Sequence, residues 1–221
     1  MAVFPNKKSV QPKKEQVEEM FDNISHRYDL LNHLLSANID KIWRRNAIIK
    51  LKKSQPKTIL DIATGTGDFA IAATKINNTE ITGIDISEGM LDVGRKKIAR
   101  KGLTDIIKLQ KADSENLPFE NDLFDAAIVG FGVRNFENLE KGLTEILRVL
   151  KPEGVFYVLE FSKPQKTPFK QFYKFYFTKI LPLVGRMVSK DTNAYTYLPE
   201  SVKEFPAGER LLTILAEVGF K

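Results

Sequence analysis

The chain has 221 residues, 43% of them hydrophobic, and a formal net charge of +6. This length and composition fit one globular domain with a sizeable core. Because the sequence contains no cysteine, disulfides, thiolate metal ligands and cysteine nucleophiles are excluded. The basic clusters, such as Arg44-Arg45, fit either solvated helix faces or a surface that meets anionic lipid. Without a zinc or RNA-binding motif, we expect no nucleic-acid partner.

The N-terminal residues and the apolar runs give no sign of export or of a membrane anchor. Residues 1–14 lack the apolar segment of a signal peptide, and no apolar run approaches the length of a membrane span. We therefore expect a cytoplasmic protein.

Three helices are predicted before the first strand, each from apolar residues at helical spacing. They cover Gln11 to Phe21, Ser25 to Leu35 and Asp40 to Leu51. No linker separates them from the strand that begins at Thr58, so residues 1–56 are predicted to form an N-terminal helical cap on a single domain.

The most informative stretch is a short β-branched run that ends in a glycine turn. Thr58 to Ile62 predicts a buried strand, Gly65-Thr66-Gly67 a tight turn, and Asp68 the start of a helix. The turn also fits the dinucleotide fingerprint, in which a pyrophosphate meets the helix N-terminus. Two carboxylates, Asp61 and Asp68, instead favour a cationic ligand such as S-adenosylmethionine. NAD is kept as the alternative.

Strands and helices then alternate, which implies a mostly parallel sheet with helices on both faces over residues 57–162. Further strands are predicted at Glu80 to Asp85, Asp105 to Lys111, Phe124 to Gly130 and Val155 to Glu160. Helices are predicted at Glu88 to Lys101, capped by Ser87, and at Leu139 to Leu150, followed by a turn at Lys151 to Gly154.

Residues 163–221 depart from this alternation. The aromatic segment Lys163 to Leu183 is either a core-packing helix or a wall for an apolar substrate, with a face for the bilayer. Asp191 to Pro206 is predicted to be a lid loop. Gly208 to Val218 predicts a last helix.

Three segments are more specific than the glycine turn. They are Tyr28 to Ser36 with Trp43 downstream, Gly130 to Asn135, and Arg148 to Gly154 continuing through Leu159 to Pro164. On these segments the chain resembles the class I S-adenosylmethionine-dependent methyltransferases, which have a Rossmann-like fold. It resembles more narrowly the demethylmenaquinone / 2-polyprenyl-1,4-benzoquinol methylase family.

The chain departs from the family pattern at a few positions. Leu31 stands where methionine is usual, Asn38 where glycine is usual, and Glu153 where a second glycine is common. The family normally continues into a final strand pair, so we expect one or more C-terminal strands to be missing.

The resemblance implies S-adenosylmethionine-dependent C-methylation of a prenylated quinol in respiratory quinone biosynthesis, with the ring a naphthoquinol, a benzoquinol or both. It implies no metal, since the sulfonium is already activated. A homodimer and peripheral contact with the inner face of the membrane are further expectations.

The candidate cofactor residues follow the predicted strand ends in order. The turn of Gly65, Thr66 and Gly67 would bind the cofactor, Asp61 beneath the turn would hold its amino group, and Asp85 would take the ribose hydroxyls. Asp113 and Ser114 would flank the adenine, and Gly130 would lie under the methionine portion.

The candidate catalytic residues are Arg134, Asn135 and Tyr28. Arg134 would stabilise a phenolate, unless it is a structural ion-pair residue. Asn135 would hold a quinol oxygen or a water, and Tyr28 would hydrogen-bond the substrate. His26 and His33 are candidates for a general base, although each also fits a surface or packing histidine.

Three alternatives to the quinol methyltransferase stay open at this point. They are an NAD-dependent oxidoreductase, a non-catalytic S-adenosylmethionine-binding protein, and a methyltransferase that acts on another small molecule.

Overall fold

The computed structural model describes residues 3–36, 38–162, 167, 171 and 192–221. Its strands are β1 (Thr58–Ile62), β2 (Glu80–Asp85), β3 (Ile107–Lys111), β4 (Phe124–Gly130) and β5 (Leu150–Leu159). Its α-helices are α1 (Lys13–Leu35), α2 (Ile39–Leu51), α3 (Asp68–Ala73), α4 (Glu88–Arg100), α5 (Leu139–Val149), α8 (Thr192–Glu204) and α9 (Glu209–Val218). Two 3-10 helices are η1 (Lys52–Ser54) and η2 (Val133–Asn135).

The strands form one sheet in the order β3-β2-β1-β4-β5, and every neighbouring pair is parallel. The predicted parallel sheet is confirmed. The chain order reverses between β1 and β4, and such a switch point opens a crevice at the carboxyl ends of the strands.

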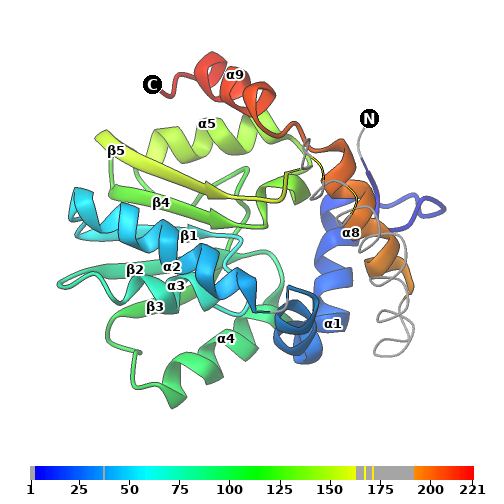
Figure 1. Ribbon diagram of the computed structural model, residues 1–221, viewed down its shortest axis with the longest axis horizontal. Coiled ribbons are helices and arrows are strands. Elements are labelled where there is room, and N and C mark those ends of the chain that lie inside the picture. Colours follow the sequence, from blue (N-terminus) through cyan, green and yellow to red (C-terminus); the bar gives the residue numbers. More distant parts are fainter. Residues whose placement is uncertain (1–2, 37, 163–166, 168–170, 172–191) are drawn as a thin grey trace.

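Successive side chains along each strand point to opposite faces of the sheet, so they pack into two separate hydrophobic cores. Ile59 and Ile128 pack with α2, α3 and α4 on one face of the sheet. Leu60 and Ile62 pack with α5 and α9 on the other. Helices therefore cover both faces, as predicted (Figure 1).

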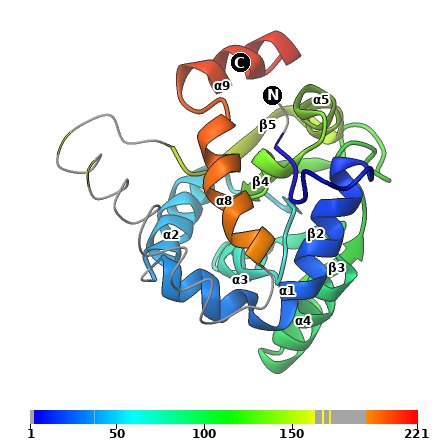
Figure 2. The same cartoon turned by 90° about the vertical axis from the view of Figure 1, so that its right-hand side faces the viewer.

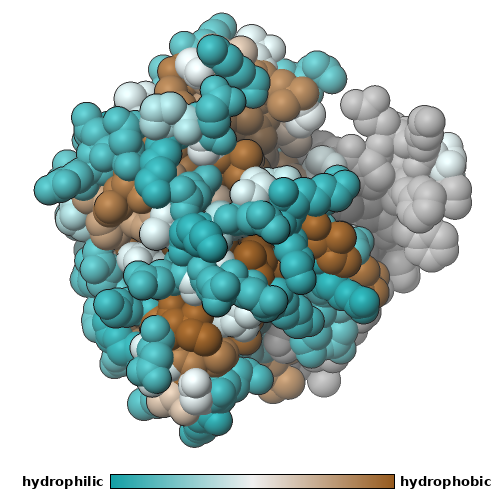
Figure 3. All heavy atoms as spheres, turned by 90° about the vertical axis from the view of Figure 1, so that its left-hand side faces the viewer, coloured by the Kyte–Doolittle hydropathy of each residue, from teal (hydrophilic) through white to brown (hydrophobic). Residues whose placement is uncertain are grey.

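The two ends of the strands differ. The carboxyl ends point toward α1 and α8, which lie side by side across that edge (Figures 1 and 2). The opposite side of the molecule is mostly hydrophilic, with hydrophobic side chains in separate patches (Figure 3). A ligand site is thus expected under α1 and α8.

The first two predicted helices are one continuous helix, α1, so the predicted break between Phe21 and Ser25 is wrong. Aspartate and serine favour helix ends, but here the side chains of Asp22 and Ser25 form hydrogen bonds that leave the helix intact. The Asp22 carboxylate accepts from the backbone N–H of Gly89 at 2.9 Å, and the Ser25 hydroxyl donates to the Asp22 carbonyl. Asp22 therefore caps α4, and α1 runs on.

The predicted lid loop at Asp191 to Pro206 is also wrong, because Thr192–Glu204 is helix α8. The helix contains Pro199, yet it buries Tyr197, Ser201 and Val202, and that burial outweighs the lost hydrogen bond. The aromatic segment Lys163 to Leu183 lies outside the described residues, apart from Thr167 and Gln171. The division into residues 1–56, 57–162 and 163–221 stays a prediction.

Two positions that depart from the family pattern have left-handed backbone. Asn38 has φ 60° and Glu153 has φ 66°, a region that glycine occupies most easily. Glu153 belongs to the predicted turn Lys151 to Gly154, which is a bulge inside β5. Phe124 pairs with Leu150 and Ala126 with Val155, so four residues stand opposite one.

Candidate active site

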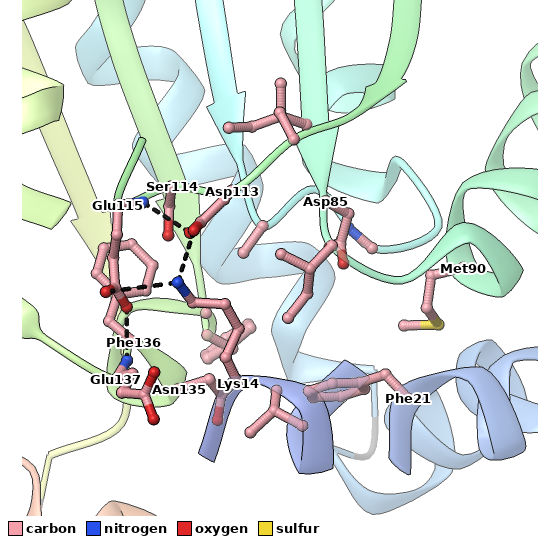
Figure 4. A pocket seen from close by; sticks show the side chains of 18 of the residues that line it. Lys14, Phe21, Asp85, Met90, Asp113, Ser114, Glu115, Asn135, Phe136 and Glu137 are labelled. Carbon is pink, nitrogen blue, oxygen red and sulfur yellow. Dashed lines mark hydrogen bonds and ion pairs between the residues drawn. The ribbon is translucent and has the colours of Figure 1, made fainter. Parts of the chain in front are cut away.

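A cleft lies at the carboxyl ends of the central strands and is covered by α1 (Figure 4). α1 contributes Lys14, Val17, Phe21 and Tyr28 to its lining. The carboxyl ends of the strands and the segments after them contribute Ala63, Gly65, Asp85, Ile86, Ala112, Asp113, Ser114, Glu115, Gly130, Phe131, Gly132, Asn135, Phe136 and Glu137. Ile84 and Met90 complete the lining.

The glycine turn brings backbone close to the cleft. Gly65 has φ 56°, and a Cβ there would stand 3.3 Å from the Cε of Met90. Gly130 also lines the cleft, and a Cβ there would stand 3.0 Å from the ring of Phe69. The positive φ of Gly65 favours glycine there, and a side chain at Gly130 would press on the buried ring of Phe69.

Thr66 and Gly67 are not among the lining residues. The Thr66 hydroxyl donates to Asp29 at 2.5 Å and accepts from the Lys97 ammonium at 2.9 Å. Gly67 has φ 79° and packs toward Ile98. These two residues shape the turn from behind, while Gly65 faces the ligand space.

Asp85 lines the cleft and also braces the turn. Its two carboxylate oxygens accept from the backbone N–H of Gly65 at 2.8 Å and of Ser87 at 2.9 Å. Burial raises its pKa to about 6, despite these hydrogen bonds. Each oxygen keeps a lone pair for a further donor such as a hydroxyl group.

Asp61 lies under the turn and is 1% exposed. Its Oδ2 accepts from the Thr64 hydroxyl at 2.6 Å and from the Ala70 N–H at 2.9 Å. Its Oδ1 is buried and has no hydrogen-bond partner within the described chain. Burial raises the pKa of Asp61 to about 7. An unpartnered buried carboxylate oxygen fits a cationic ligand nearby.

The far end of the cleft is acidic and is tied to α1 (Figure 4). The Lys14 ammonium stands 2.6 Å from Asp113 and 3.7 Å from Glu115. Burial opposes the charge of Lys14, but the hydrogen bond to Asp113 and the nearby carboxylates outweigh it and raise its pKa. Glu115 in turn accepts from the backbone N–H of Glu137 at 2.7 Å. Ser114 lines the cleft between these acids.

Of the three candidate catalytic residues, two line the cleft. Tyr28 projects from α1, and burial raises its pKa to about 12, so it is a hydrogen-bond donor at neutral pH. Asn135 lies in η2 at the end of β4. Arg134 is not among the lining residues: its guanidinium is 2.7 Å from Glu160, both side chains are buried, and it also donates to the Phe131 carbonyl.

Several residues at the site were missed by sequence reasoning. Lys14 and Glu137 resemble ordinary surface charges in the sequence, and Phe131 resembles a core residue although its φ is 60°. Tyr197 donates from α8 to Asn135 at 3.1 Å. Of the candidate bases, His26 is exposed and is not a lining residue, and the side chain of His33 lies outside the described part.

The charge balance of the lining distinguishes the two candidate cofactors. Among the lining residues that the structure describes, the acids are Asp85, Asp113, Glu115 and Glu137, and the one basic residue is Lys14. A pyrophosphate would meet this acidic surface unfavourably, whereas an ammonium or sulfonium group would be attracted.

The sheet order, the glycine turn after its central strand and the acid-lined cleft define a Rossmann-like class I methyltransferase. Two solved structures share this fold. A possible histamine N-methyltransferase from Thermotoga maritima has a TM-score of 0.62 at 20% identity, covering 92% of this chain and 81% of that one. A putative S-adenosylmethionine-dependent methyltransferase from Methanococcus maripaludis has a TM-score of 0.58 at 22% identity, covering 97% and 88%.

Residues 9–221 match the model of the ubiE/COQ5 methyltransferase family, and the chain belongs to this family. A demethylmenaquinone methyltransferase from Bacteroides fragilis is 48% identical, over 94% of this chain and 85% of that protein. A ubiquinone/menaquinone biosynthesis C-methyltransferase, UbiE, from Geotalea daltonii is 47% identical, over 95% and 89%. The family resemblance is confirmed, and the oxidoreductase alternative is rejected.

Proposed function

We propose that this protein methylates a ring carbon of a prenylated quinol with S-adenosylmethionine as methyl donor. The observation that carries the proposal is the acid-lined cleft at the switch point of the sheet, with a glycine floor and a buried, unpartnered carboxylate oxygen at Asp61. The names of the relatives support the substrate: one acts on demethylmenaquinone, the other in ubiquinone and menaquinone biosynthesis.

The cofactor side uses residues that follow β1, β2, β3 and β4. Asp85 binds the ribose hydroxyls, while Asp113 and Ser114 flank the adenine. Gly65 and Gly130 leave room for the chain of the ligand, and Thr66 and Gly67 shape the turn. Asp61 supplies negative charge for the amino group. When bound, S-adenosylmethionine supplies an electrophilic methyl group, so no further activation of the donor is required.

The substrate side holds the quinol so that its ring carbon faces the methyl group, and this alignment provides most of the acceleration. Tyr28 and Asn135 donate hydrogen bonds to the quinol oxygen next to the reacting carbon. These bonds stabilise the phenolate that forms when the quinol hydroxyl group passes its proton to solvent water. Arg134 lies behind these two residues: its charge partly opposes the rise that burial gives to the pKa of Tyr28, and in the same way it would favour a phenolate in the cleft.

We propose further that the protein meets a membrane surface, where a prenylated quinol resides. Support comes from α2, whose exposed side chains include Ile39, Ile42, Trp43 and Ile49, next to Lys41 and Arg45. No helix within the described ranges is long and apolar enough to cross a membrane. Cosedimentation with anionic vesicles, compared between the native chain and an Ile42→Glu, Ile49→Glu variant, tests this contact.

The substrate is tested by incubating the purified protein with S-adenosylmethionine and chemically reduced demethylmenaquinone of short prenyl length. The expected product carries one added methyl group on the ring, detected by mass spectrometry. The oxidised quinone is the matched control, because it lacks a phenolic proton to lose. A reduced 2-polyprenyl-6-methoxy-benzoquinone in the same assay decides the ring class. Methylation of neither ring by a folded, cofactor-binding sample would contradict the proposal.

A further inference from the structure

Tyr197 carries a buried hydroxyl group from α8 to the rim of the cleft. It is 3% exposed and packs with Val17 and Met20 of α1. Its hydroxyl group donates to Oδ1 of Asn135 at 3.1 Å. Because the ring is enclosed, the hydroxyl group has little freedom to leave that position.

The backbone around Asn135 is fixed independently of Tyr197. The ammonium of Lys13, on α1, donates to the carbonyl of Phe136 at 2.7 Å and to that of Arg134 at 3.3 Å. The Asn135 N–H donates to the Gly132 carbonyl at 2.9 Å. These backbone contacts do not fix the side-chain amide of Asn135, which can turn either its oxygen or its NH2 group toward the cleft.

We infer that Tyr197 is a positioning residue that holds Oδ1 of Asn135 toward α8 and so directs the NH2 group of Asn135 into the cleft. The inference rests on the proposed function, in which a quinol oxygen becomes anionic. An NH2 group stabilises that oxygen, whereas a flipped amide would place its own oxygen against it.

One observation favours a role through Asn135 over direct contact with the substrate. Tyr197 is not among the residues that line the cleft, whereas Asn135 is. Burial raises the pKa of Tyr197 to about 12, so its hydroxyl group stays protonated and remains a donor across the neutral range.

A double-mutant cycle tests this role. Tyr197→Phe keeps the packed ring and removes the hydroxyl group. We expect kcat to fall about tenfold, with KM and the Kd for S-adenosylhomocysteine nearly unchanged. In an Asn135→Ala background the same substitution should have no further effect, and an equal loss in both backgrounds would overturn the inference. Tyr157→Phe, in β5, is the matched control and should leave kcat unchanged.

A second measurement does not depend on the substrate. The side-chain NH2 signals of Asn135 in a ¹⁵N correlation spectrum are assigned by their loss in Asn135→Ala. Tyr197→Phe should shift these signals and speed their exchange with water, while Tyr157→Phe should not. Unchanged signals in Tyr197→Phe would overturn the inference whatever the substrate is. Shifted signals in a protein that methylates no quinol would support the inference and reject only the proposed function.

Discussion

The cofactor side and the substrate side of the cleft are built in different ways. On the proposed cofactor side, each candidate residue lies at or just after the carboxyl end of a strand. Asp85 holds Gly65 of the neighbouring loop, and Lys14 of α1 holds Asp113. On the substrate side, η2 is held by Lys13 of α1 and Tyr197 of α8, which are 123 and 62 residues from their partners.

This difference separates the roles of the two sides. The strand ends of the sheet place the residues of the cofactor side. This placement fits a ligand that the whole fold class shares. The substrate side depends on helices that are not part of the sheet. Changes to Lys13 or Tyr197, which hold η2, should therefore alter substrate turnover, whereas changes at the strand ends should alter cofactor affinity.

The largest expected effect comes from breaking the buried ion pair behind the substrate side. Arg134→Met leaves the Glu160 carboxylate buried without a countercharge and should lower the free energy of unfolding by about 3–5 kcal/mol. Urea unfolding followed by circular dichroism measures this. The double variant Arg134→Met, Glu160→Leu should recover part of the loss. A loss below about 1 kcal/mol, the value typical of an exposed pair, would show that Arg134 is not a structural residue.

The cofactor side is tested by Asp85→Ala. This substitution removes a carboxylate that braces Gly65 and faces the ligand space, so the Kd for S-adenosylhomocysteine should rise about 100-fold. Asp92→Ala, an exposed acid on α4, is the control and should leave the Kd within about twofold. Equal Kd values for native protein and Asp85→Ala would contradict the assigned role.

The two buried acids of the cofactor side predict a pH dependence. Burial raises the pKa of Asp61 to about 7 and that of Asp85 to about 6, so the free protein holds extra protons there below neutral pH. A cationic ligand binds the ionised forms, and its affinity should fall about tenfold from pH 8 to pH 6. For the protein without ligand, the free energy of unfolding changes in the opposite direction. The contribution of these two acids is fully present below their ordinary pKa of 3.8 and is lost as pH rises from there to their raised pKa values of about 6 and 7. Titration calorimetry at several pH values should show a flatter profile for Asp61→Asn.

The smallest effect concerns the bulge in β5, away from both sides of the cleft. Glu153 has φ 66°, so Glu153→Gly should relieve strain and raise the free energy of unfolding by about 0.5–1 kcal/mol. Gly154→Ala should do the reverse, because its Cβ would stand 2.7 Å from the Lys151 carbonyl oxygen. Thermal unfolding measures the stability of both variants against that of the native chain. Cofactor affinity and kcat should not change in Glu153→Gly.

The cofactor side was largely predictable from sequence. The bounds of β2 and β4 match the predicted strands, and the Ser87 cap of α4 is confirmed by its hydrogen bond from the Met90 N–H. Buried parallel strands can be recognised in a sequence as short runs of β-branched residues. A capping serine or a glycine turn is also a local signal, because it depends only on nearby residues.

The substrate side was less predictable because its contacts are distant in sequence. Asp22 caps a helix 67 residues away, so the apparent break in α1 is absent. Tyr197 is buried against α1, so a segment with proline folds as helix α8. Lys13 is an ordinary basic residue in the sequence, but it is buried beneath η2.

Titration calorimetry tests whether the acid-lined cleft binds S-adenosylmethionine rather than a dinucleotide. The purified protein is titrated with S-adenosylhomocysteine and, separately, with NADH. We expect micromolar binding of S-adenosylhomocysteine and no binding of NADH. Binding of NADH alone, or of neither ligand to a folded sample, would contradict this expectation.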